Sequence, residues 1–265
     1  MNFVVYTAIA NDYDYPRKIP KSMKSTDFIC YCNTSETKKI AEKNGWKVRS
    51  FPSETEDSTR ICRDIKVRPH IYLPNYSASL WVDGTVQITN LAASELFNLL
   101  ASKTLFATFK HPSSRDVHEE GQKCKAAKKD DAKIIDETLN YIFSQGFPKA
   151  HATYETCVIF RFHNDQTVKN AMEKWHEIIT YYSRRDQLSL GFSLWLHGLK
   201  SELLNGSIRG QSSSFYRGRH RNHGLQGYLA YIDAYSFNNP LVFILKKAVL
   251  LISRLNKMVR EFGRS

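Results

Sequence analysis

Several groups of residues combine types and spacings that could do chemistry, and the first is the run WVDGT at residues 81–85. An acid followed by glycine ends an apolar run there, so the carboxylate of Asp83 would point into a cleft. Carboxylate oxygens bind hard divalent cations of the kind that bridge a diphosphate. The alternative interpretation of Asp83 is a residue that only caps a turn.

A second group is a row of cations at residues 60–66. Arg63 and Lys66 are three residues apart, so on a helix they share a face, and Arg60 lies on the same side. Such a row beside an anionic ligand would neutralise phosphate charge. The alternative is a basic helix face in contact with water.

The third group is the segment SRRDQ at residues 183–187, between two predicted helices. Asp186 and Gln187 could face a sugar, and a carboxylate there could accept a proton from a sugar hydroxyl. Asp186 could equally be the N-cap of the helix that follows, where an acid is also favoured. The residues alone do not separate these two interpretations.

The fourth group is a cationic segment with histidines at residues 216–224. We expect a loop that could close over a pyrophosphate through Arg221 and His220, with His220 or His223 completing a metal site. The alternatives are an arm that binds nucleic acid and a solvated loop.

The basic end of the chain is the fifth group. Residues 241–265 predict an amphipathic helix with an apolar side and a Lys/Arg side. Such a helix can lie on an anionic membrane, or its apolar side can simply pack on the domain.

Elements that alternate between strand and helix must position these groups. Apolar or β-branched runs predict strands, and periodic runs that follow capping residues predict helices. The predicted strands are 3–9, 27–32, 46–51, 79–82, 105–109 and 157–162, and the predicted helices are 35–43, 57–67, 92–101, 132–144, 168–182 and 188–199. This order predicts an α/β fold with a mostly parallel sheet flanked by helices, whose ligand lies beyond the carboxyl ends of the strands. Asp83 and the loop after Ile9 are at such ends, and residues 205–227 predict a long loop.

Composition narrows the class of protein. The chain has 265 residues, of which 42% are hydrophobic and 24% charged, as in soluble globular proteins. Its net charge is +12, and the segment from residue 200 onward has eleven Lys and Arg against three Asp and Glu. An anionic partner at that end is expected. An odd number of cysteines, five, without a secretory signal predicts a cytoplasmic protein, and we find no apolar run that could span a membrane.

Taken together, these segments resemble a known family. It comprises the glycosyltransferase-like domains of plant mucilage and cell-wall proteins and of bacterial and viral sugar-polymer loci. The segments that carry the resemblance run collinearly through residues 3–195, namely 5–9, 12–14, 63–70, 79–84, 110–112, 119–120, 146–148 and 183–189.

The resemblance implies a GT-A-like domain over residues 1–204 that uses a UDP- or GDP-sugar donor and a glycan or lipid-linked acceptor. Catalysis would fall to Asp186 and Gln187. The implied donor-binding residues are Tyr6, Thr7, Ala8, Asp14, Arg60, Arg63, Lys66, Trp81, Asp83, Gly84, His220 and Arg221.

The resemblance also implies a divalent cation, Mn²⁺ or Mg²⁺, on the donor diphosphate. Asp83 matches the usual metal-binding carboxylate, and His220 and His223 are its candidate companions. The second carboxylate that is usual two positions on is replaced by Thr85, so cationic side chains are the alternative partners of the diphosphate.

We therefore expect a glycosyltransferase at the cytoplasmic membrane face, with a basic loop region at residues 205–240 and a terminal helix at 241–265. Two other functions remain open. A nucleic-acid-binding protein is suggested by the basic end, although nucleic acid is not the partner we expect. A catalytically silent sugar-binding relative is suggested by Thr85.

Overall fold

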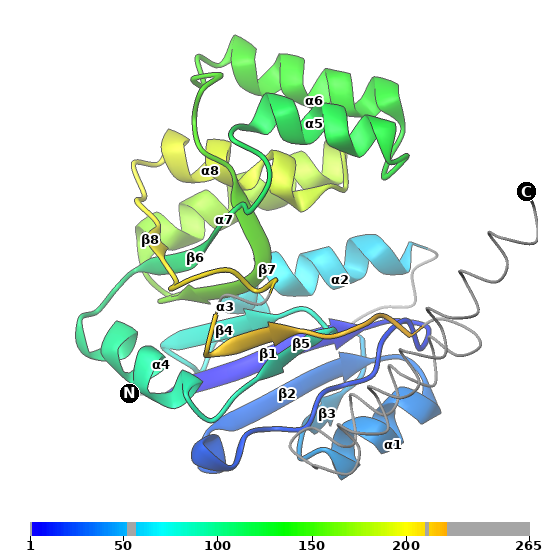
Figure 1. The fold of residues 1–265 in the computed structure, drawn as a ribbon, viewed down its shortest axis with the longest axis vertical. Helices are drawn as coiled ribbons and strands as arrows, with labels where there is room; N and C mark the ends of the chain where they lie inside the picture. The colour runs from blue at the N-terminus through cyan, green and yellow to red at the C-terminus, as the bar shows by residue number, and fades with distance from the viewer. Residues whose placement is uncertain (1, 52–56, 210–211, 222–265) are drawn as a thin grey trace, which may run out of the picture.

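The computed structural model describes residues 2–51, 57–209 and 212–221, and its centre is a seven-stranded sheet (Figure 1). Both His223 and the predicted terminal helix lie outside the described residues. In spatial order the strands are β3 (Lys47–Arg49), β2 (Asp27–Cys32), β1 (Phe3–Ile9), β4 (Ala78–Val82), β7 (Tyr154–Arg161), β6 (Phe106–Lys110) and β8 (Glu202–Leu203). A separate antiparallel pair joins β5 (Val86–Ile88) to β9 (Phe215–Arg217).

The sheet is mixed but mostly parallel. β1 pairs in parallel with β2 and β4, β2 with β3, and β6 with β8, whereas β7 runs antiparallel to both β4 and β6. Because β7 is reversed, its first residues lie at the edge where β1, β4 and β6 end. This single edge therefore gathers the loops after Ile9, Val82 and Lys110 together with the start of β7.

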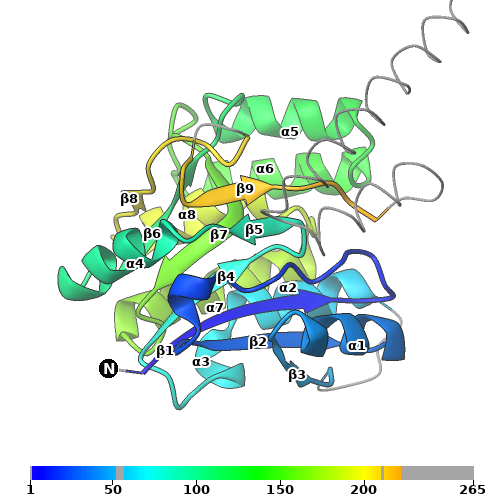
Figure 2. The same ribbon diagram turned by 60° about the horizontal axis from the view of Figure 1, so that its bottom comes forward.

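Helices cover both faces of the sheet (Figures 1 and 2). α2 (Ser58–Val67), α7 (Gln166–Tyr181) and α8 (Leu190–Leu196) pack on one face, with Ile65 and Trp175 fully buried. α1 (Ser35–Lys43), α4 (Ala92–Ala101) and the β5–β9 pair cover the other. β4 is buried along its whole length because both of its faces are covered.

A third apolar cluster holds two further helices against α7 and α8. α5 (Val117–Ala126) and α6 (Ala132–Ser144) pack together and onto α7 and α8 through residues such as Ile142, Ile178 and Phe192. The remaining short elements are α3 (Pro69–Tyr72) and the 3-10 turns Lys21–Met23 and Asp186–Leu188.

The expected α/β class is confirmed, and some local predictions are wrong. α5 was not predicted, because its buried positions include Glu120 and Gly121 and leave little apolar periodicity. The strand predicted at 46–51 is only Lys47–Arg49, and the helix predicted at 188–199 is only Leu190–Leu196. β9 lies inside the segment predicted as a long loop.

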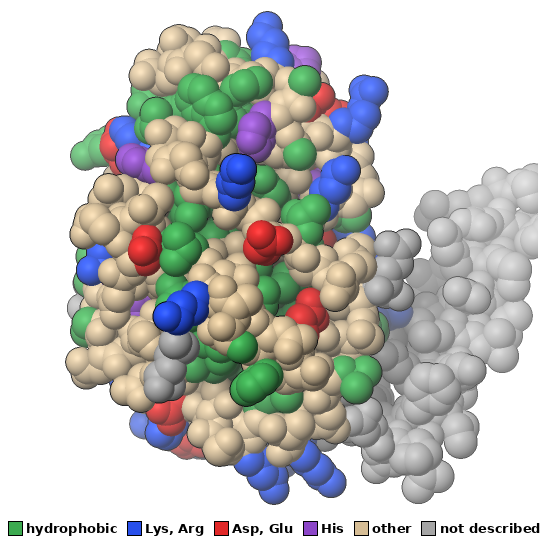
Figure 3. All heavy atoms as spheres, turned by 90° about the vertical axis from the view of Figure 1, so that its left-hand side faces the viewer, with side chains coloured by type: hydrophobic (Ala, Val, Ile, Leu, Met, Phe, Trp, Pro, Cys, Tyr) green, Lys and Arg blue, Asp and Glu red, His purple; other side chains and the backbone are tan. Residues whose placement is uncertain are grey.

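The surface of the described residues is electrostatically mixed on the side shown in Figure 3. Lys and Arg side chains stand apart from one another there, with Asp and Glu among them and small apolar areas between. This face resembles the surface of an ordinary globular protein rather than a continuous basic stripe.

A buried histidine after β7 gives the fold a dependence on pH. His163 is fully buried, with Nδ1 3.0 Å from the Ser79 hydroxyl and Nε2 3.2 Å from the Leu73 carbonyl oxygen. Burial, helped by the charge of Arg161, lowers the pKa of His163 to about 4. The unfolded chain binds this proton near pH 6.5 and the folded chain does not.

We therefore expect unfolding to become easier as pH falls from about 6.5 toward 4, by about 1.4 kcal/mol per pH unit from this group. Urea denaturation at several pH values in this window measures the slope. His163→Gln should reduce it, and His118→Gln, at an exposed position, should not. Equal slopes in His163→Gln and the wild type would contradict the assignment.

Candidate functional site

Two cavities adjoin at the carboxyl edge of the sheet. The larger, of about 690 Å³, is bounded by the loop after β1, the start of α2, the ends of β4 and β6, α5, the start of β7 and residues 184–187. The smaller, of about 600 Å³, lies between the β2–α1 loop, β3 and α2. Asn11 and Ser58 line both cavities, so the two spaces meet beside these side chains.

The loop after β1 is held in place by its own polar residues. Asn11 and Asp12 adopt left-handed backbone conformations, with φ of 51° and 53°, which Asn and Asp tolerate better than most residues. Oδ1 of Asp12 accepts hydrogen bonds from the Thr37 hydroxyl (2.6 Å) and from the Thr34 hydroxyl at the N-terminus of α1. Asn11 Nδ2 donates to the Ser58 hydroxyl at 3.2 Å, which ties the loop to α2.

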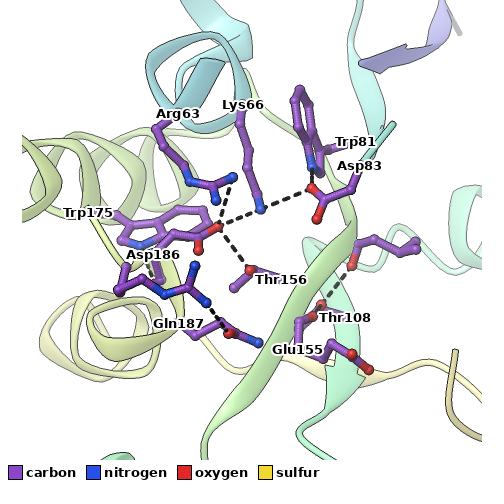
Figure 4. A network of polar contacts seen from close by, with 12 residues as sticks. Arg63, Lys66, Trp81, Asp83, Thr108, Glu155, Thr156, Trp175, Asp186 and Gln187 are labelled. Atoms are coloured by element: carbon purple, nitrogen blue, oxygen red, sulfur yellow. Dashed lines mark hydrogen bonds and ion pairs between the residues drawn. The ribbon is translucent and has the colours of Figure 1, made fainter. Parts of the chain in front are cut away.

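At the centre of the site a buried cation lies between two carboxylates (Figure 4). Lys66, on α2, is fully buried, and its Nζ lies 2.5 Å from Oδ2 of Asp186 and 3.4 Å from Oδ1 of Asp83. Trp81 Nε1 donates to the same Asp83 oxygen at 2.7 Å. An ion pair therefore links α2 to the end of β4, in addition to the packing between them.

Asp186 is held ionised by its neighbours. Burial alone would raise the pKa of this carboxyl, but the charges of Arg63 (3.6 Å) and Lys66 outweigh burial and keep the pKa well below its usual range. The Thr156 hydroxyl also donates to it at 2.9 Å. The N-cap interpretation of Asp186 is wrong, because the turn is capped at Arg185 and the carboxylate faces the ion cluster instead.

The end of β4 comes very close to the loop after β1. A Cβ at Gly84 would lie 2.9 Å from the Cβ of Asp14 and 3.1 Å from the Ile9 side chain. Glycine is therefore needed for this approach, which brings Asp83 and Asp14 into one cavity wall. Thr85 is buried and does not line the cavity.

Residues 215–221, which we call the strap, form the last wall of the larger cavity. β9 begins the strap, and Gly218 N donates to the Thr85 carbonyl at 2.8 Å. Further on, His220 Nδ1 lies 3.0 Å from Oδ1 of Asp14. The strap thereby brings Arg217 and His220 to the same space as Asp83.

Many of the residues predicted from the sequence meet in the larger cavity. They come from five separate segments, which the fold brings to one edge. Those that line it are Ala8, Asp14, Arg63, Trp81, Asp83, Gly84, Asp186, Gln187 and His220.

Other predicted donor-binding residues lie away from the cavity surface. Tyr6 and Thr7 are fully buried in β1. The Tyr6 hydroxyl donates to the Lys66 carbonyl at 2.6 Å, and burial raises its pKa to about 12. Lys66 does not line the cavity, but it forms ion pairs with Asp83 and Asp186, which do. These three residues are buried beneath the cavity wall and do not line the cavity.

Two further arginines are used elsewhere in the fold. Arg60 donates to the carbonyls of Ile179 and Thr180, which links α2 to the end of α7. Arg221 pairs with Glu36 on α1 at 3.0 Å, and its guanidinium lies 4.9 Å from the centre of the Tyr15 ring. Neither lines the two cavities described above, so the donor-binding role expected for them from the sequence stays a prediction.

The sequence analysis missed residues on both sides of the site. Asn33 and Lys38 line the smaller cavity, and Asn33 could have been found because it follows a predicted strand. Glu155, Arg209 and Arg217 line the larger one. The local sequence does not indicate that Glu155 lies at the site. The start of β7 reaches this edge only because the strand runs antiparallel to its neighbours.

The cavity offers a divalent cation few ligands from the protein, and Asp83 is the carboxylate that we consider for it. Within residues 2–51, 57–209 and 212–221, no three His, Cys, Asp or Glu side chains gather as a metal-binding group. Asp83 lines the cavity with one oxygen already shared by Lys66 and Trp81. A cation at Asp83 would thus take most of its ligands from a bound diphosphate, whose oxygens suit Mg²⁺.

A mostly parallel sheet with a charged cavity beyond the carboxyl ends of its strands is typical of α/β domains that bind ligands at this edge. Residues 1–204 match the family described as TOD1/MUCI70, glycosyltransferase-like domain. The chain belongs to this family, which confirms the resemblance, and the mostly parallel sheet flanked by helices confirms the α/β architecture expected from the sequence. Glycosyl transfer is the general class of activity that this membership supports.

Solved structures of glycosyltransferases are also similar to the chain. The apo structure of the bifunctional glycosyltransferase WbbM shares 10% identity at a TM-score of 0.48 over 93% of this chain and 51% of its own, so this chain spans about half its length. Apo mouse xyloside xylosyltransferase 1 shares 12% identity at a TM-score of 0.42, over 77% and 84% of the two chains. A glycosyltransferase involved in glycosylation of the major capsid of PBCV-1 shares 10% at 0.42, over 87% and 98%. No curated protein matches the chain in sequence.

Proposed function

We propose that this protein transfers a sugar from a nucleotide-sugar donor, a UDP- or GDP-sugar, to a glycan or lipid-linked acceptor. The observation that carries the proposal is the pair of adjoining cavities at the carboxyl edge, with Arg63 and Asp83 in the wall of the larger one. The nucleoside would occupy the smaller cavity and the sugar the larger. The diphosphate would cross the junction beside Asn11 and Ser58.

The smaller cavity suits a base and a ribose. Val48, Phe51 and Ile61 supply apolar surface, while Asn33 and Lys38 supply polar groups that could recognise a base edge or ribose hydroxyls. Ser and Thr side chains make up most of the remaining lining, so the wall offers hydrogen-bonding groups beside its apolar surface.

The larger cavity suits the charge that develops during transfer. Seven Lys and Arg side chains line it against five Asp and Glu. Glycosyl transfer places negative charge on the departing diphosphate, so fixed cations stabilise the transition state more than the ground state. Arg63 is carried by α2, the helix that begins at the junction residue Ser58, and its guanidinium lies 3.6 Å from Asp186.

A divalent cation, Mn²⁺ or Mg²⁺, is part of the proposal. Asp83 would hold it, with His220 in the same cavity and His223 as a further candidate from sequence. When bound, the cation would supply Lewis-acid neutralisation of the diphosphate. The protein residues orient the donor, and Lys66 pairs with both Asp83 and Asp186.

Nucleotide binding is the direct test. UDP- or GDP-sugar with Mn²⁺ is expected to raise the melting temperature, since a ligand at a hundred times its Kd adds about 2.7 kcal/mol. Asp83→Asn should lose most of the rise, and EDTA should abolish it if the cation is required. Asp136→Asn, at a surface pair with Lys125, is the matched control. No rise with any donor would contradict the proposal.

A catalytically silent relative would behave differently in the same experiment. It would bind the donor and never release free nucleotide, with or without acceptor. Strong, salt-dependent retention of RNA or DNA without any donor effect would instead favour the nucleic-acid alternative.

The proposed location is the cytoplasm, at the membrane surface where a lipid-linked acceptor is found. This part of the proposal comes from the sequence of residues 241–265. In the part of the chain that the structure describes, no helix has both the length and the apolar character of a membrane span.

A further inference from the structure

A bulge in β7 turns three consecutive residues toward the larger cavity. β6 and β7 pair at Thr108–Ile159 and then at Phe109–Glu155, so residues 156–158 of β7 have no counterpart on β6. The Thr108 hydroxyl closes the bulge through contacts of 2.7 Å with the carbonyls of Glu155 and Val158. Residues 155–157 all line the cavity as a result. Bulges of this kind often re-aim side chains next to active sites.

The carboxylate that this bulge places in the cavity is incompletely paired. Glu155 is only 3% exposed, and the nearest cation is Arg209, whose Nε lies 3.7 Å from Oε1. Oε2 is buried and has no hydrogen-bond partner among the described residues. An unsatisfied buried carboxylate oxygen is costly to keep, so its position points to a ligand group that it meets. Figure 4 shows this side chain directed away from the Lys66 cluster.

The carboxylates at the centre of the cavity differ in the partners that surround them. Asp186 is held ionised by Arg63 and Lys66, which makes it a poor base. Asp83 is occupied by Lys66 and Trp81. For Glu155, burial raises the pKa above its ordinary value, and the charges of Arg209 and Arg217 offset this only in part. A general base works best when its pKa lies close to the working pH.

We propose that Glu155 is the general base of the transfer and takes the proton of the acceptor hydroxyl, an inference that rests on the proposed function. The acceptor O–H bond breaks and its proton passes to the Glu155 carboxylate. The acceptor oxygen forms a bond to the anomeric carbon of the sugar. The bond from that carbon to the diphosphate breaks, and its electron pair leaves with the diphosphate. A single displacement of this kind inverts the anomeric configuration.

The test uses water as the acceptor, so it needs no knowledge of the natural glycan. The full chain is incubated with UDP-glucose, UDP-galactose, UDP-xylose or GDP-mannose and Mn²⁺, and nucleotide release is measured for the wild type, Glu155→Gln and Glu155→Asp. Glu155→Gln should lower turnover by about 10²- to 10⁴-fold. It should leave the donor-induced rise in melting temperature intact. Glu202→Gln, on the exposed strand β8, is the matched control.

Two further readouts separate a base from a structural role. The fall in wild-type turnover at low pH should disappear in Glu155→Gln and persist in Glu155→Asp at reduced rate. Proton NMR of the sugar first released from the α-linked donors should show the β anomer.

The outcomes distinguish the two proposals. Wild-type turnover with unchanged turnover in Glu155→Gln, or release of the α anomer, would overturn the role of Glu155 and leave the transferase standing. Donor binding and turnover absent from the wild type would overturn the proposed function and this inference with it.

Discussion

Replacing Lys66 by methionine is expected to lower the free energy of unfolding by about 3–5 kcal/mol. The methionine fills most of the same space, so the loss would come from charge. Asp186 is almost fully buried, and without the ammonium 2.5 Å away its negative charge would rely on Arg63 at 3.6 Å and the Thr156 hydroxyl. Urea denaturation followed by circular dichroism measures the change.

A double variant separates charge from packing. In Lys66→Met/Asp186→Asn the buried cation and its closest anion are both removed, and a large part of the lost stability should return. Lys39→Met, at an exposed position of α1, is the control for loss of a lysine. If Lys66→Met were as stable as Lys39→Met, the buried pair would not be holding α2 against the 186–188 turn.

Replacing Arg63 by methionine is expected to lower sugar transfer or donor hydrolysis by about 10²- to 10³-fold. Arg63 lines the larger cavity, in which the proposed diphosphate gains negative charge as it leaves. The fold should tolerate this change, because Asp186 keeps its 2.5 Å contact with Lys66. Nucleotide release at saturating donor measures the effect on turnover.

The control for Arg63 is an exposed arginine that does not line the cavity. Arg115 has a side chain that is 90% exposed, so Arg115→Met removes the same charge and should leave turnover unchanged. A comparable loss of turnover in both variants would mean that the net charge of the protein, and not the position of Arg63, sets the rate. Full activity in Arg63→Met would contradict the position that we propose for the diphosphate.

The parts of the fold that could be predicted are those with strong local signals. β1 and α6 have the predicted bounds, because a β-branched run and a capped amphipathic run are each unambiguous. The reversal of β7 could not be predicted, because strand direction depends on how the chain returns across the sheet. β9 was also missed, since its pairing with β5 joins segments more than a hundred residues apart.

The same division applies to the site. Asp83 and Asp14 could be proposed from the rule that ligands meet the carboxyl ends of parallel strands, and both line the cavity. Tyr6 could not be excluded, because only the packed structure shows that its hydroxyl turns inward to the Lys66 carbonyl. Glu155 needed both a reversed strand and a bulge to reach the cavity, and neither has a sequence signature here.

The strap lies outside the part of the chain that the family shares. The match to the family ends at residue 204, whereas the wall that carries Arg217 and His220 comes after it and is anchored on the body at Thr85 and Asp14. The residues that supply Arg63, Asp83 and Asp186 and the strap that completes the same cavity are therefore encoded in separate stretches of the gene. A change confined to the later stretch would alter one wall of the cavity and leave Arg63, Asp83 and Asp186 in place.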